Sequence, residues 1–446
     1  MLLVLLLAAL LHAPAAPGAT GFAAASAART DTASARLSDD ELLERVQRRT
    51  FAYFWEFADP ASGMARERSN VTREYGHEVA ATGGTGFGVM ATTVAVERGW
   101  VTRAQAVDRL LRLTAFLAKA DRFHGAFPHW MNGATGRVIP FDRLDDGGDV
   151  VETAYLFEGL LTARQYFDRA EPGETELRRR IDTLWHGVEW DAFVRPGRNT
   201  LWWTWSPRHG FADGGEVSGW NEALVTYVLA AGSPDHAIDT LTYHHGWARD
   251  GAIRNGNDFA GITLPLGPPE GGPLFFEHYS FMGIDPRGLT DRYADYWLQA
   301  LNHTLINREH CVSDPAGFAG YGENAWGLTA SDDPGGYRAH SPTEDDGVLA
   351  PTAALSAFPY APEFAMQALR HFHDDLGGTL FGPYGFADAF DPGTGWVAPS
   401  CIAIDEGPII VMIENYRTGL PWRLFMSCPE VQAGLRKLGF SSPWLR

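Results

Sequence analysis

Residues 102–117, TRAQAVDRLLRLTAFL, carry a complete signal for one amphipathic helix. Thr102 and Gln105 have the spacing of a capping box, in which the hydroxyl accepts from the third amide and the longer side chain reaches back to the first. Apolar residues then recur every three or four positions, at Val107, Leu110, Leu111, Leu113, Phe116 and Leu117. This spacing predicts a helix that buries one stripe against a neighbour.

Similar helix signals return along the whole chain. Residues 38–41 form a second capping box and open a helix whose phenylalanines Phe51, Phe54 and Phe57 share one stripe. Residues 85–98 predict a small-residue helix that ends at Gly99, a left-handed cap. Further helices are predicted over 149–167, 174–190, 219–231, 234–247, 290–307, 348–357, 362–376, 406–418 and 428–438. Runs with clean strand alternation are few, so the fold class is all-α.

The connections between these helices differ in length. Long loops rich in Gly, Pro, Trp and acidic residues span 123–149, 197–219, 251–273 and 311–346. Long ordered loops inside a compact domain are usually functional. Helix pairs joined alternately by short and long loops predict a toroid with its site at the long-loop end. No sequence repeat with a period of roughly 20–50 residues is present, which disfavours a solenoid.

Composition narrows the class of partner. The chain has 446 residues with 36 Lys and Arg against 55 Asp and Glu, a formal charge of −19. Such a field repels phosphate backbones and excludes a nucleic-acid partner. The 15 tryptophans suit either a large core or the flat faces of sugar rings. A neutral oligo- or polysaccharide is therefore the expected partner.

The N-terminal segment predicts export. Residues 2–11 are an unbroken apolar run, long enough for a signal-peptide core and too short to span a bilayer. Small residues follow at 13–16 and 23–25, and the absence of a basic residue before Leu2 points to a start upstream of Met1. We expect a signal peptide and leader over 1–36, one domain over 37–446, no membrane span, and a monomer in the periplasm or outside the cell.

No cofactor or metal is expected. The three cysteines lie far apart and lack a C-x-x-C pattern, which favours buried thiols, although one disulfide stays open. His244-His245 and the histidines of 371–374 have no partners at metal-ligand spacing. Residues 83–88, GGTGFG, follow no β-branched strand, so helix packing is a better interpretation than a nucleotide turn.

A first acidic group lies near residue 149. With a helix starting at Asp149, that residue and Glu152 share a face, and Asp145 lies in the incoming loop. Capping of the helix explains Asp149 alone equally well. Three converging acids favour a catalytic site.

Two further carboxyl groups have the surroundings that glycoside hydrolysis needs. Glu222 follows Trp220 and precedes an apolar helix, which would raise its pKa and suit it to general acid catalysis. Asp405 leaves an apolar segment just before Pro408. The alternatives are a first-turn glutamate and an N-terminal cap. An inverting glycosidase needs two carboxyl groups across the scissile bond, and Glu222 and Asp405 could supply them.

Aromatic and polar residues of the loops and of the last long helix are the predicted substrate contacts. Aromatic faces stack on sugars, and an acid with a nearby arginine can hold hydroxyls. The predicted set is Trp130, Trp203, Trp220, His278, Tyr279, Trp326, Tyr384, Asp388, Glu414 and Arg417.

Several of these motifs resemble the bacterial glucoamylase-like proteins of glycoside hydrolase family 144. The markers are 85–88 (TGFG), 97–100 (ERGW), 152–154 (ETA), 163–167 (ARQYF), 219–222 (GWNE), 278–281 (HYSF), 285–288 (DPRG), 326–332 (WGLTASD), 351–355 (PTAAL), 384–386 (YGF), 405–408 (DEGP) and 413–417 (IENYR). The resemblance runs from about residue 38 to the C-terminus, with the glucoamylase-like region at about 210–435. One departure is Glu406, where the family pattern has Gln after the aspartate.

This resemblance implies an (α/α)6 toroid of six helical hairpins that hydrolyses β-1,2-glucan with inversion and without metal or organic cofactor. It also implies a central acidic cleft with Glu222 as proton donor and Asp405 as the leading base; Asp145, Asp149, Glu152, Glu222 and Asp405 match the cleft by motif. Two alternatives stay open: a noncatalytic glycan-binding or envelope-assembly protein, and a glycosidase or lyase for another linkage. The acidic balance argues against a lyase, which needs cations beside a uronate.

Overall fold

The helices form where the sequence supplies caps and apolar stripes. In α3 (Arg103–Leu117), the Thr102 side chain accepts from the Gln105 amide while the Gln105 side chain accepts from the Thr102 amide at 2.9 Å. In α4 (Val150–Tyr166), the Asp149 side chain caps the helix by accepting from the amides of Val151 and Glu152. Both predicted helices are confirmed.

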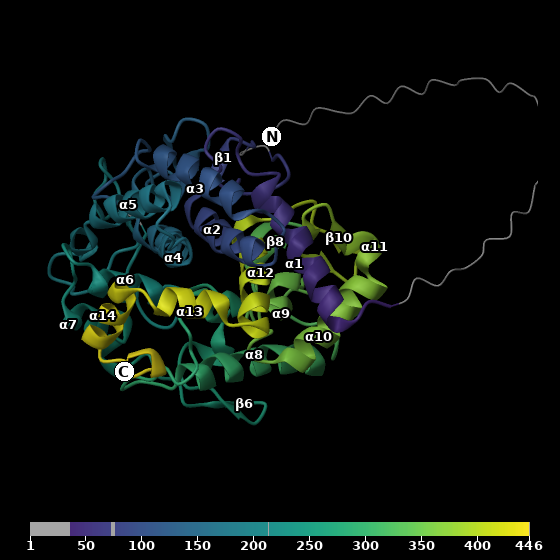
Figure 1. Cartoon of the computed structure of the whole chain (residues 1–446). Coiled ribbons are helices and arrows are strands. Elements are labelled where there is room, and N and C mark those ends of the chain that lie inside the picture. Colours follow the sequence, from purple (N-terminus) through teal and green to yellow (C-terminus); the bar gives the residue numbers. More distant parts are fainter. Residues whose placement is uncertain (1–35, 73–75, 213, 446) are drawn as a thin grey trace, which may run out of the picture. The chain divides into compact units, whose positions relative to one another are not determined.

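The structure is a computed structural model that describes residues 36–72, 76–212 and 214–445 (Figure 1). The predicted signal-peptide core and almost all of the leader lie outside the described residues. Residues 39–446 form one compact unit. Within the described part of the chain, none of the helices combines the length and the apolarity needed to cross a bilayer.

The unit is mostly helical, with short strands at its loops. The remaining helices are α1 (Asp39–Trp55), α2 (Thr82–Glu97), α5 (Pro172–His186), α6 (Leu224–Gly232), α7 (Thr240–Thr242), α8 (Tyr296–Ser313), α9 (Pro351–Leu355), α10 (Pro362–Arg370), α11 (Gly377–Leu380), α12 (Ala403–Arg417), α13 (Leu420–Met426) and α14 (Pro429–Leu438).

The strands pair antiparallel and are two to four residues long. Three of them, β1 (Val79–Ala81), β2 (Trp130–Asn132) and β3 (Val138–Ile139), form one small sheet in that order. The others form two-stranded pairs: β4 (Gly148–Asp149) with β5 (Thr204–Trp205), β6 (Asp258–Phe259) with β7 (Ile262–Thr263), β8 (Ala330–Asp333) with β9 (Gly336–Ala339), β10 (Phe381–Gly382) with β11 (Gly385–Phe386), and β12 (Phe390–Asp391) with β13 (Trp396–Val397).

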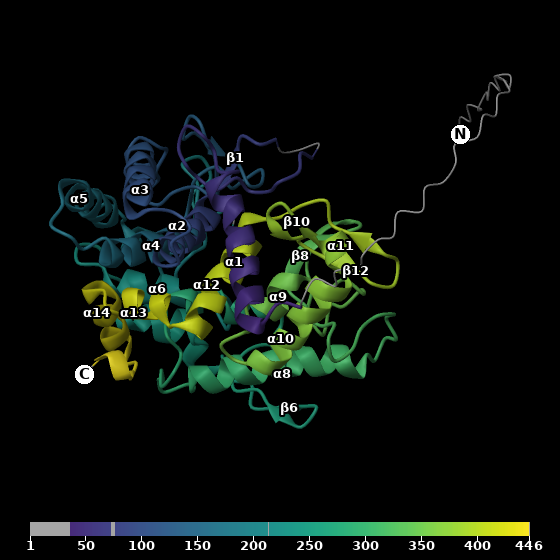
Figure 2. The same cartoon turned by 45° about the vertical axis from the view of Figure 1, so that its right-hand side comes forward.

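Burial separates inner helices from outer ones. Helices α2, α4, α6 and α12 are buried along nearly their whole length, whereas α3, α5, α10 and α14 bury one stripe only. A helix that is apolar all round belongs inside a large protein, and an amphipathic helix covers it. Helix α12 packs against α1 and α2, and α2 packs against α4 (Figures 1 and 2).

The glycines of residues 83–88 serve helix packing, as predicted. They lie in α2, where a Cβ on Gly86 would stand 2.1 Å from the backbone oxygen of Tyr155 on α4. A Cβ on Gly159 of α4 would meet the Gly86 oxygen at 2.0 Å. The two inner helices therefore touch backbone to backbone, which fixes Glu152 on α4 beside the start of α2.

Gly86→Ala is expected to destabilise the protein by about 1–3 kcal/mol, because the added methyl group must separate two backbones in a packed core. Gly378→Ala is the matched control, since Gly378 lies in α11 and its Cβ would meet nothing within 4 Å. The control should gain up to about 1 kcal/mol from helix propensity. Urea unfolding of both variants measures the difference, and equal stabilities would contradict the backbone contact.

Some predicted helix bounds are wrong. The predicted helix 290–307 begins at Tyr296, because Asp295 caps it and Thr290 instead pairs with Ser441. The helix predicted over 234–247 shrinks to α7 and a π-helical turn, Tyr243–Trp247. Helix α13 was not predicted. At Thr290 a tertiary pairing overrides local propensity.

Candidate active site

One cavity gathers acidic and aromatic side chains from distant parts of the chain. Its volume is about 470 Å³. It is lined by Glu67, Arg68, Ala81, His129, Trp130, Phe141, Glu152, Tyr155, Trp203, Glu222, Phe275, Tyr279, Ala330, Tyr337, Ala339, Ile402 and Ile404. These residues come from the segment that leads into and ends β1, from the segment that runs from His129 to Phe141, from α4, from the loops before β5 and α6, from residues 275–279, from the β8–β9 hairpin and from the start of α12.

Glu222 lies in the turn that leads into α6. Its backbone oxygen accepts from the hydroxyls of Ser280 and Tyr155, which holds the turn against the neighbouring segments. Burial raises the pKa of its carboxyl to about 7, and the charges of Glu152 and Asp149 act in the same direction. A carboxyl group with this pKa carries a proton through much of the neutral range and can donate it.

Glu152 faces the same cavity from the first turn of α4. Its Oε2 accepts from the amide of Gly83 at 2.6 Å, at the start of α2. Burial raises the pKa of Glu152 to about 7 against the lowering effect of the His129 charge. The charge of Glu152 in turn raises the proton affinity of Glu222.

The His129 side chain lies between Asp149 and Glu152. Its Nδ1 lies 2.9 Å from Asp149 Oδ2, and its Nε2 lies 4.0 Å from Glu152 Oε1. Burial favours the neutral imidazole, but the Glu152 charge and the Asp149 hydrogen bond outweigh it and raise the pKa of His129 to about 9. The side chain is therefore a cation near neutral pH, which balances part of the acidic cluster.

His129 and its acidic neighbours also have the donor types of a metal site. Ligand-type atoms of His129, Asp145 and Asp149 lie within 4.8 Å of one another. However, Asp149 Oδ1 already accepts from two backbone amides, and Oδ2 faces His129. The contacts of Asp149 are therefore those of a helix cap and of an ion pair with His129. Asp146, in contrast, turns away and accepts from Ser206 at 2.5 Å.

Stability should depend on pH through His129. The folded-state pKa of about 9 lies above the usual value of 6.5, so folding favours the protonated ring. The stability advantage of wild type over His129→Gln should be full below about pH 6.5 and fall by about 3 kcal/mol as the pH rises from there through about 9. Urea unfolding of both proteins across this range checks it; a constant difference would show that folding does not raise the pKa of the ring.

Asp405 lies one layer behind the cavity wall. It is 2% exposed, in the first turn of α12, between the lining residues Ile404 and Tyr279. The Tyr279 hydroxyl donates to Asp405 Oδ1 at 3.4 Å. Burial and the neighbouring Asp388 raise the pKa of Asp405 well above its usual range. Tyr279 is thus the direct connection between this carboxyl group and the cavity.

The structure brings together part of the predicted site. Glu152, Glu222, Trp130, Trp203 and Tyr279 line the cavity. Asp145, Asp149 and Asp405 are buried immediately behind lining residues.

Four predicted substrate contacts belong to the core instead. Trp220 is buried, donates from Nε1 to Glu277 at 3.0 Å and stacks on Phe281. His278 and Trp326 are almost completely buried, and Asp388 is 3% exposed away from the lining. None of the four lines the cavity, because sequence alone does not show which face of a loop residue is covered; their contact with substrate stays a prediction.

Three other predicted substrate contacts lie away from the cavity lining. Glu414 and Arg417 lie near the C-terminal end of α12; Glu414 is nine residues, or about 13 Å of helix, beyond Asp405. There Glu414 pairs with Arg98 at 2.8 Å, and Arg417 contacts α1. Tyr384 packs on Tyr53 and Phe57. Gln47 of α1 also donates to Glu414 at 3.5 Å, so all three side chains join α1 to the rest of the unit.

The sequence did not identify seven lining residues whose charged, titratable or aromatic side chains could act on a ligand. They are Glu67, Arg68, His129, Phe141, Tyr155, Phe275 and Tyr337. None of them lies in a motif whose spacing marks a site. Phe141 and Tyr337 are 45% and 51% exposed, which is unusual for large aromatic side chains and suits them to stacking on a ligand.

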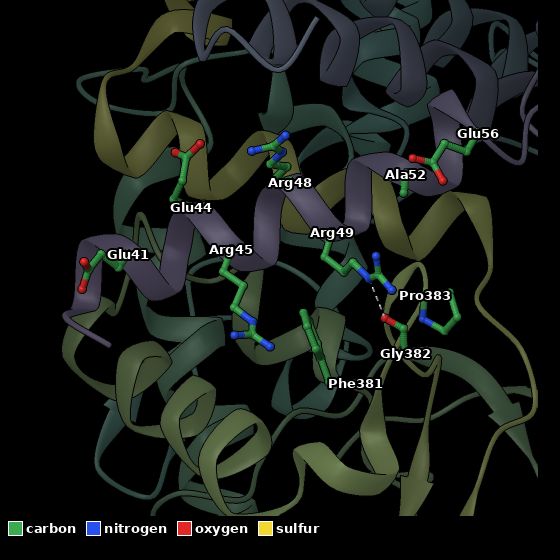
Figure 3. Close-up of a pocket in the computed structure, with 10 residues that line it drawn as sticks. All are labelled: Glu41, Glu44, Arg45, Arg48, Arg49, Ala52, Glu56, Phe381, Gly382 and Pro383. Atoms are coloured by element: carbon green, nitrogen blue, oxygen red, sulfur yellow. Dashed lines mark hydrogen bonds between the residues drawn. The ribbon is translucent and has the colours of Figure 1, made fainter. Parts of the chain in front are cut away.

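A second hollow lies on the outer face of α1, between this helix and the β10–β11 hairpin (Figure 3). It is lined by Arg45, Arg48 and Arg49 together with Glu41, Glu44 and Glu56. Arg49 Nε donates to the Gly382 oxygen at 3.0 Å, as the dashed line in Figure 3 marks. The charges of this open groove are mixed and one wall is a single ring, Phe381, so the inner cavity is the candidate active site.

Glycoside hydrolases use carboxyl groups of raised pKa beside aromatic side chains that stack on sugars. The helical fold and the cavity are those of this class of enzyme. The Glycoamylase family model, which describes a glucoamylase, matches residues 215–429. The structure of an endo-β-1,2-glucanase from Chitinophaga pinensis with sophorotriose and glucose is 51% identical, with a TM-score of 0.90 over 92% of this chain and 100% of that one. A glucoamylase-type protein from Bacteroides uniformis is 55% identical, with the same TM-score and coverage.

A third relative is the exo β-1,2-glucooligosaccharide sophorohydrolase (non-reducing end) from Parabacteroides distasonis. It is 43% identical over an alignment of 423 positions that covers 90% of this chain. The chain spans 58% of the length of that relative. The chain belongs to the bacterial glucoamylase-like family, glycoside hydrolase family 144.

Proposed function

We propose that this protein is a glycoside hydrolase that cleaves β-1,2-glucan with inversion at the anomeric carbon. The observation that carries the proposal is the cavity itself: Glu222, with a pKa of about 7, faces aromatic walls in a chain 51% identical to an endo-β-1,2-glucanase. A protonated carboxyl group beside a stacked sugar can protonate a glycosidic oxygen.

In this mechanism Glu222 is the general acid and Asp405 is the general base. Inversion requires one proton to reach the leaving oxygen while another leaves the attacking water on the opposite face. Because Asp405 does not line the cavity, it takes up the second proton through Tyr279, whose hydroxyl it contacts. No metal or organic cofactor enters any of these steps.

The other three predicted catalytic acids support the site. Glu152 faces the cavity and adds negative charge that raises the proton affinity of Glu222. Asp149 holds His129 in place, and Asp145 adds a further charge beside it. An oxocarbenium-like transition state carries positive charge, which such a cluster would stabilise.

The finer architecture is part of the proposal. The separation of inner and outer helices supports an (α/α)6 toroid of six helical hairpins, with the acidic cleft at its long-loop end. We further propose that residues 37–446 form a single domain, that the enzyme is a monomer, and that the leader directs it to the periplasm or outside the cell.

A panel of β-glucans of defined linkage tests the substrate. The purified chain is incubated with β-1,2-, β-1,3-, β-1,4- and β-1,6-glucans, and products are sized by chromatography. Products from β-1,2-glucan alone, released initially as the α-anomer by NMR, would support the proposal. Binding without product release would instead favour a glycan-binding protein, and initial β-anomer would exclude inversion.

A further inference from the structure

Two buried aspartates behind the cavity wall each keep one carboxyl oxygen without a donor. Asp388 Oδ2 accepts from the amide of Asp332 at 2.7 Å, and Asp405 Oδ1 accepts from Tyr279 at 3.4 Å. The second oxygens, Asp388 Oδ1 and Asp405 Oδ2, are buried with no hydrogen-bond partner in the described part of the chain. The two side chains are nevertheless placed for a hydrogen bond with each other. Two carboxylates cannot form that bond, because each is an acceptor only.

The charges around this pair do not supply a counterion to it. Arg68 approaches the cluster, but its guanidinium contacts Glu67 at 2.7 Å and Asp332 at 3.1 Å. The titratable or charged groups that face the two aspartates from the packed elements are Glu67, Arg68, Tyr279, Asp332, Tyr337, Cys401 and Glu406. Three of these seven groups are carboxyl groups and one is a cation. The charges of Glu406 and Asp332 both raise the pKa of Asp405, so the field around the pair opposes a second negative charge.

We infer that Asp388 and Asp405 share a single proton as a carboxyl–carboxylate pair, and that Asp388 thereby sets the basicity of Asp405. Asp388 is a positioning residue in this arrangement, because it acts on the reaction only through Asp405. Its role in catalysis rests on the proposed function, whereas the shared proton is a property of the free protein.

The electrostatics agree with the geometry. Burial raises the pKa of Asp388 to about 7, with Asp332 adding to the effect. Burial and the Asp388 charge raise the pKa of Asp405 well above its usual range. Interacting carboxyl groups release their protons in two separated steps that belong to the pair. The first proton of this pair therefore leaves at about pH 7, and above that pH the pair keeps its second proton.

The pair then completes the proposed reaction. The attacking water gives a proton to the Tyr279 oxygen as the Tyr279 hydroxyl proton passes to Asp405 Oδ1. The water oxygen bonds to the anomeric carbon, the glycosidic C–O bond breaks, and the leaving oxygen takes the proton of Glu222. The pair ends with two protons and returns one to solvent, and Glu222 takes one up. A base whose proton affinity lies near the working pH is the most effective.

The proton count of the pair tests the inference without any substrate. Infrared spectra recorded above about pH 7, where the pair has lost its first proton, separate the C=O band of a protonated carboxyl from that of a carboxylate. Glu158→Gln calibrates the area of one such group, because Glu158 is fully buried, has an unpartnered Oε2, and lies outside the cavity lining. The double variant Asp388→Asn/Asp405→Asn should lose the same area as this control. A loss twice as large, or no loss, would overturn the shared proton.

Wild-type protein gives a second measurement, which does not depend on the variants folding. With ¹³C at the aspartate side-chain carboxyls, the two carbons should both respond in each of two separated titration steps. Two carbons that each titrate in one independent step would overturn the pair.

Asp388→Asn should in addition lower kcat on β-1,2-glucan and shift the acidic limb of its pH profile, with little change in KM. If the pair holds one proton but the wild-type protein does not hydrolyse β-1,2-glucan, the proposed function is wrong and the shared proton stands.

Discussion

Glu222→Gln is expected to lower kcat on β-1,2-glucan by about 10²–10⁴-fold, the range that a positioned general acid contributes. The amide keeps the size and the hydrogen-bonding capacity of the side chain but has no proton to give to the glycosidic oxygen. Binding should stay within a few-fold of wild type, since the aromatic walls are unchanged. Rates from reducing-end release and Kd from calorimetry check the two statements.

Two controls make this result specific. Glu216→Gln removes a partly exposed carboxyl group of the preceding loop, 3.8 Å from Arg198 and outside the cavity lining, and should leave kcat unchanged. A nitrophenyl β-sophoroside has a leaving group that needs little protonation, so Glu222→Gln should lose much less activity on it. In wild type, kcat/KM should fall as the pH rises above about 7, because Glu222 then loses its proton. Undiminished glucan hydrolysis by the variant would remove Glu222 from the mechanism.

The parts of the fold that could be predicted are those that local chemistry determines. The Thr102–Gln105 capping box and the Asp149 cap each lie within a few residues of the helix they start. The glycines of α2 were also informative, because small residues in a helix indicate close packing. Contacts between residues distant in sequence could not be predicted. A helix was therefore predicted at Thr290, which in the structure pairs with Ser441.

The residues of the candidate site also differ in whether their local sequence marks them. Glu222 and Glu152 have sequence surroundings that mark them: one follows Trp220 and precedes an apolar helix, and the other is in the first turn after an N-cap. His129 and Tyr337 reach the cavity only through the folding of their loops, and no local pattern identifies them. Glu414 shows the opposite case, a residue chosen from its sequence surroundings that lies away from the cavity lining. Its place on the same helix as Asp405 suggested a shared site, but the length of that helix carries it to the contacts with Arg98.

Asp405→Asn tests the other half of the mechanism and should also lower kcat by about 10²–10⁴-fold. The substituted amide would keep the buried shape but could not hold the proton that leaves the attacking water. Azide needs no deprotonation before it attacks carbon, so it should bypass this defect. With azide added, the variant should therefore release an α-glycosyl azide, detected by mass spectrometry and NMR, while wild type continues to use water.

Glu406→Gln is the matched control, because Glu406 is equally buried at 2% exposure but faces Cys401 rather than Tyr279. It should keep activity within about tenfold and should not respond to azide. The competing assignment is Glu152, which lines the cavity directly and has a pKa of about 7. If Glu152→Gln, and not Asp405→Asn, forms the glycosyl azide, then the base faces the substrate without Tyr279 between them. The buried aspartate pair would then have no part in removing the proton from water.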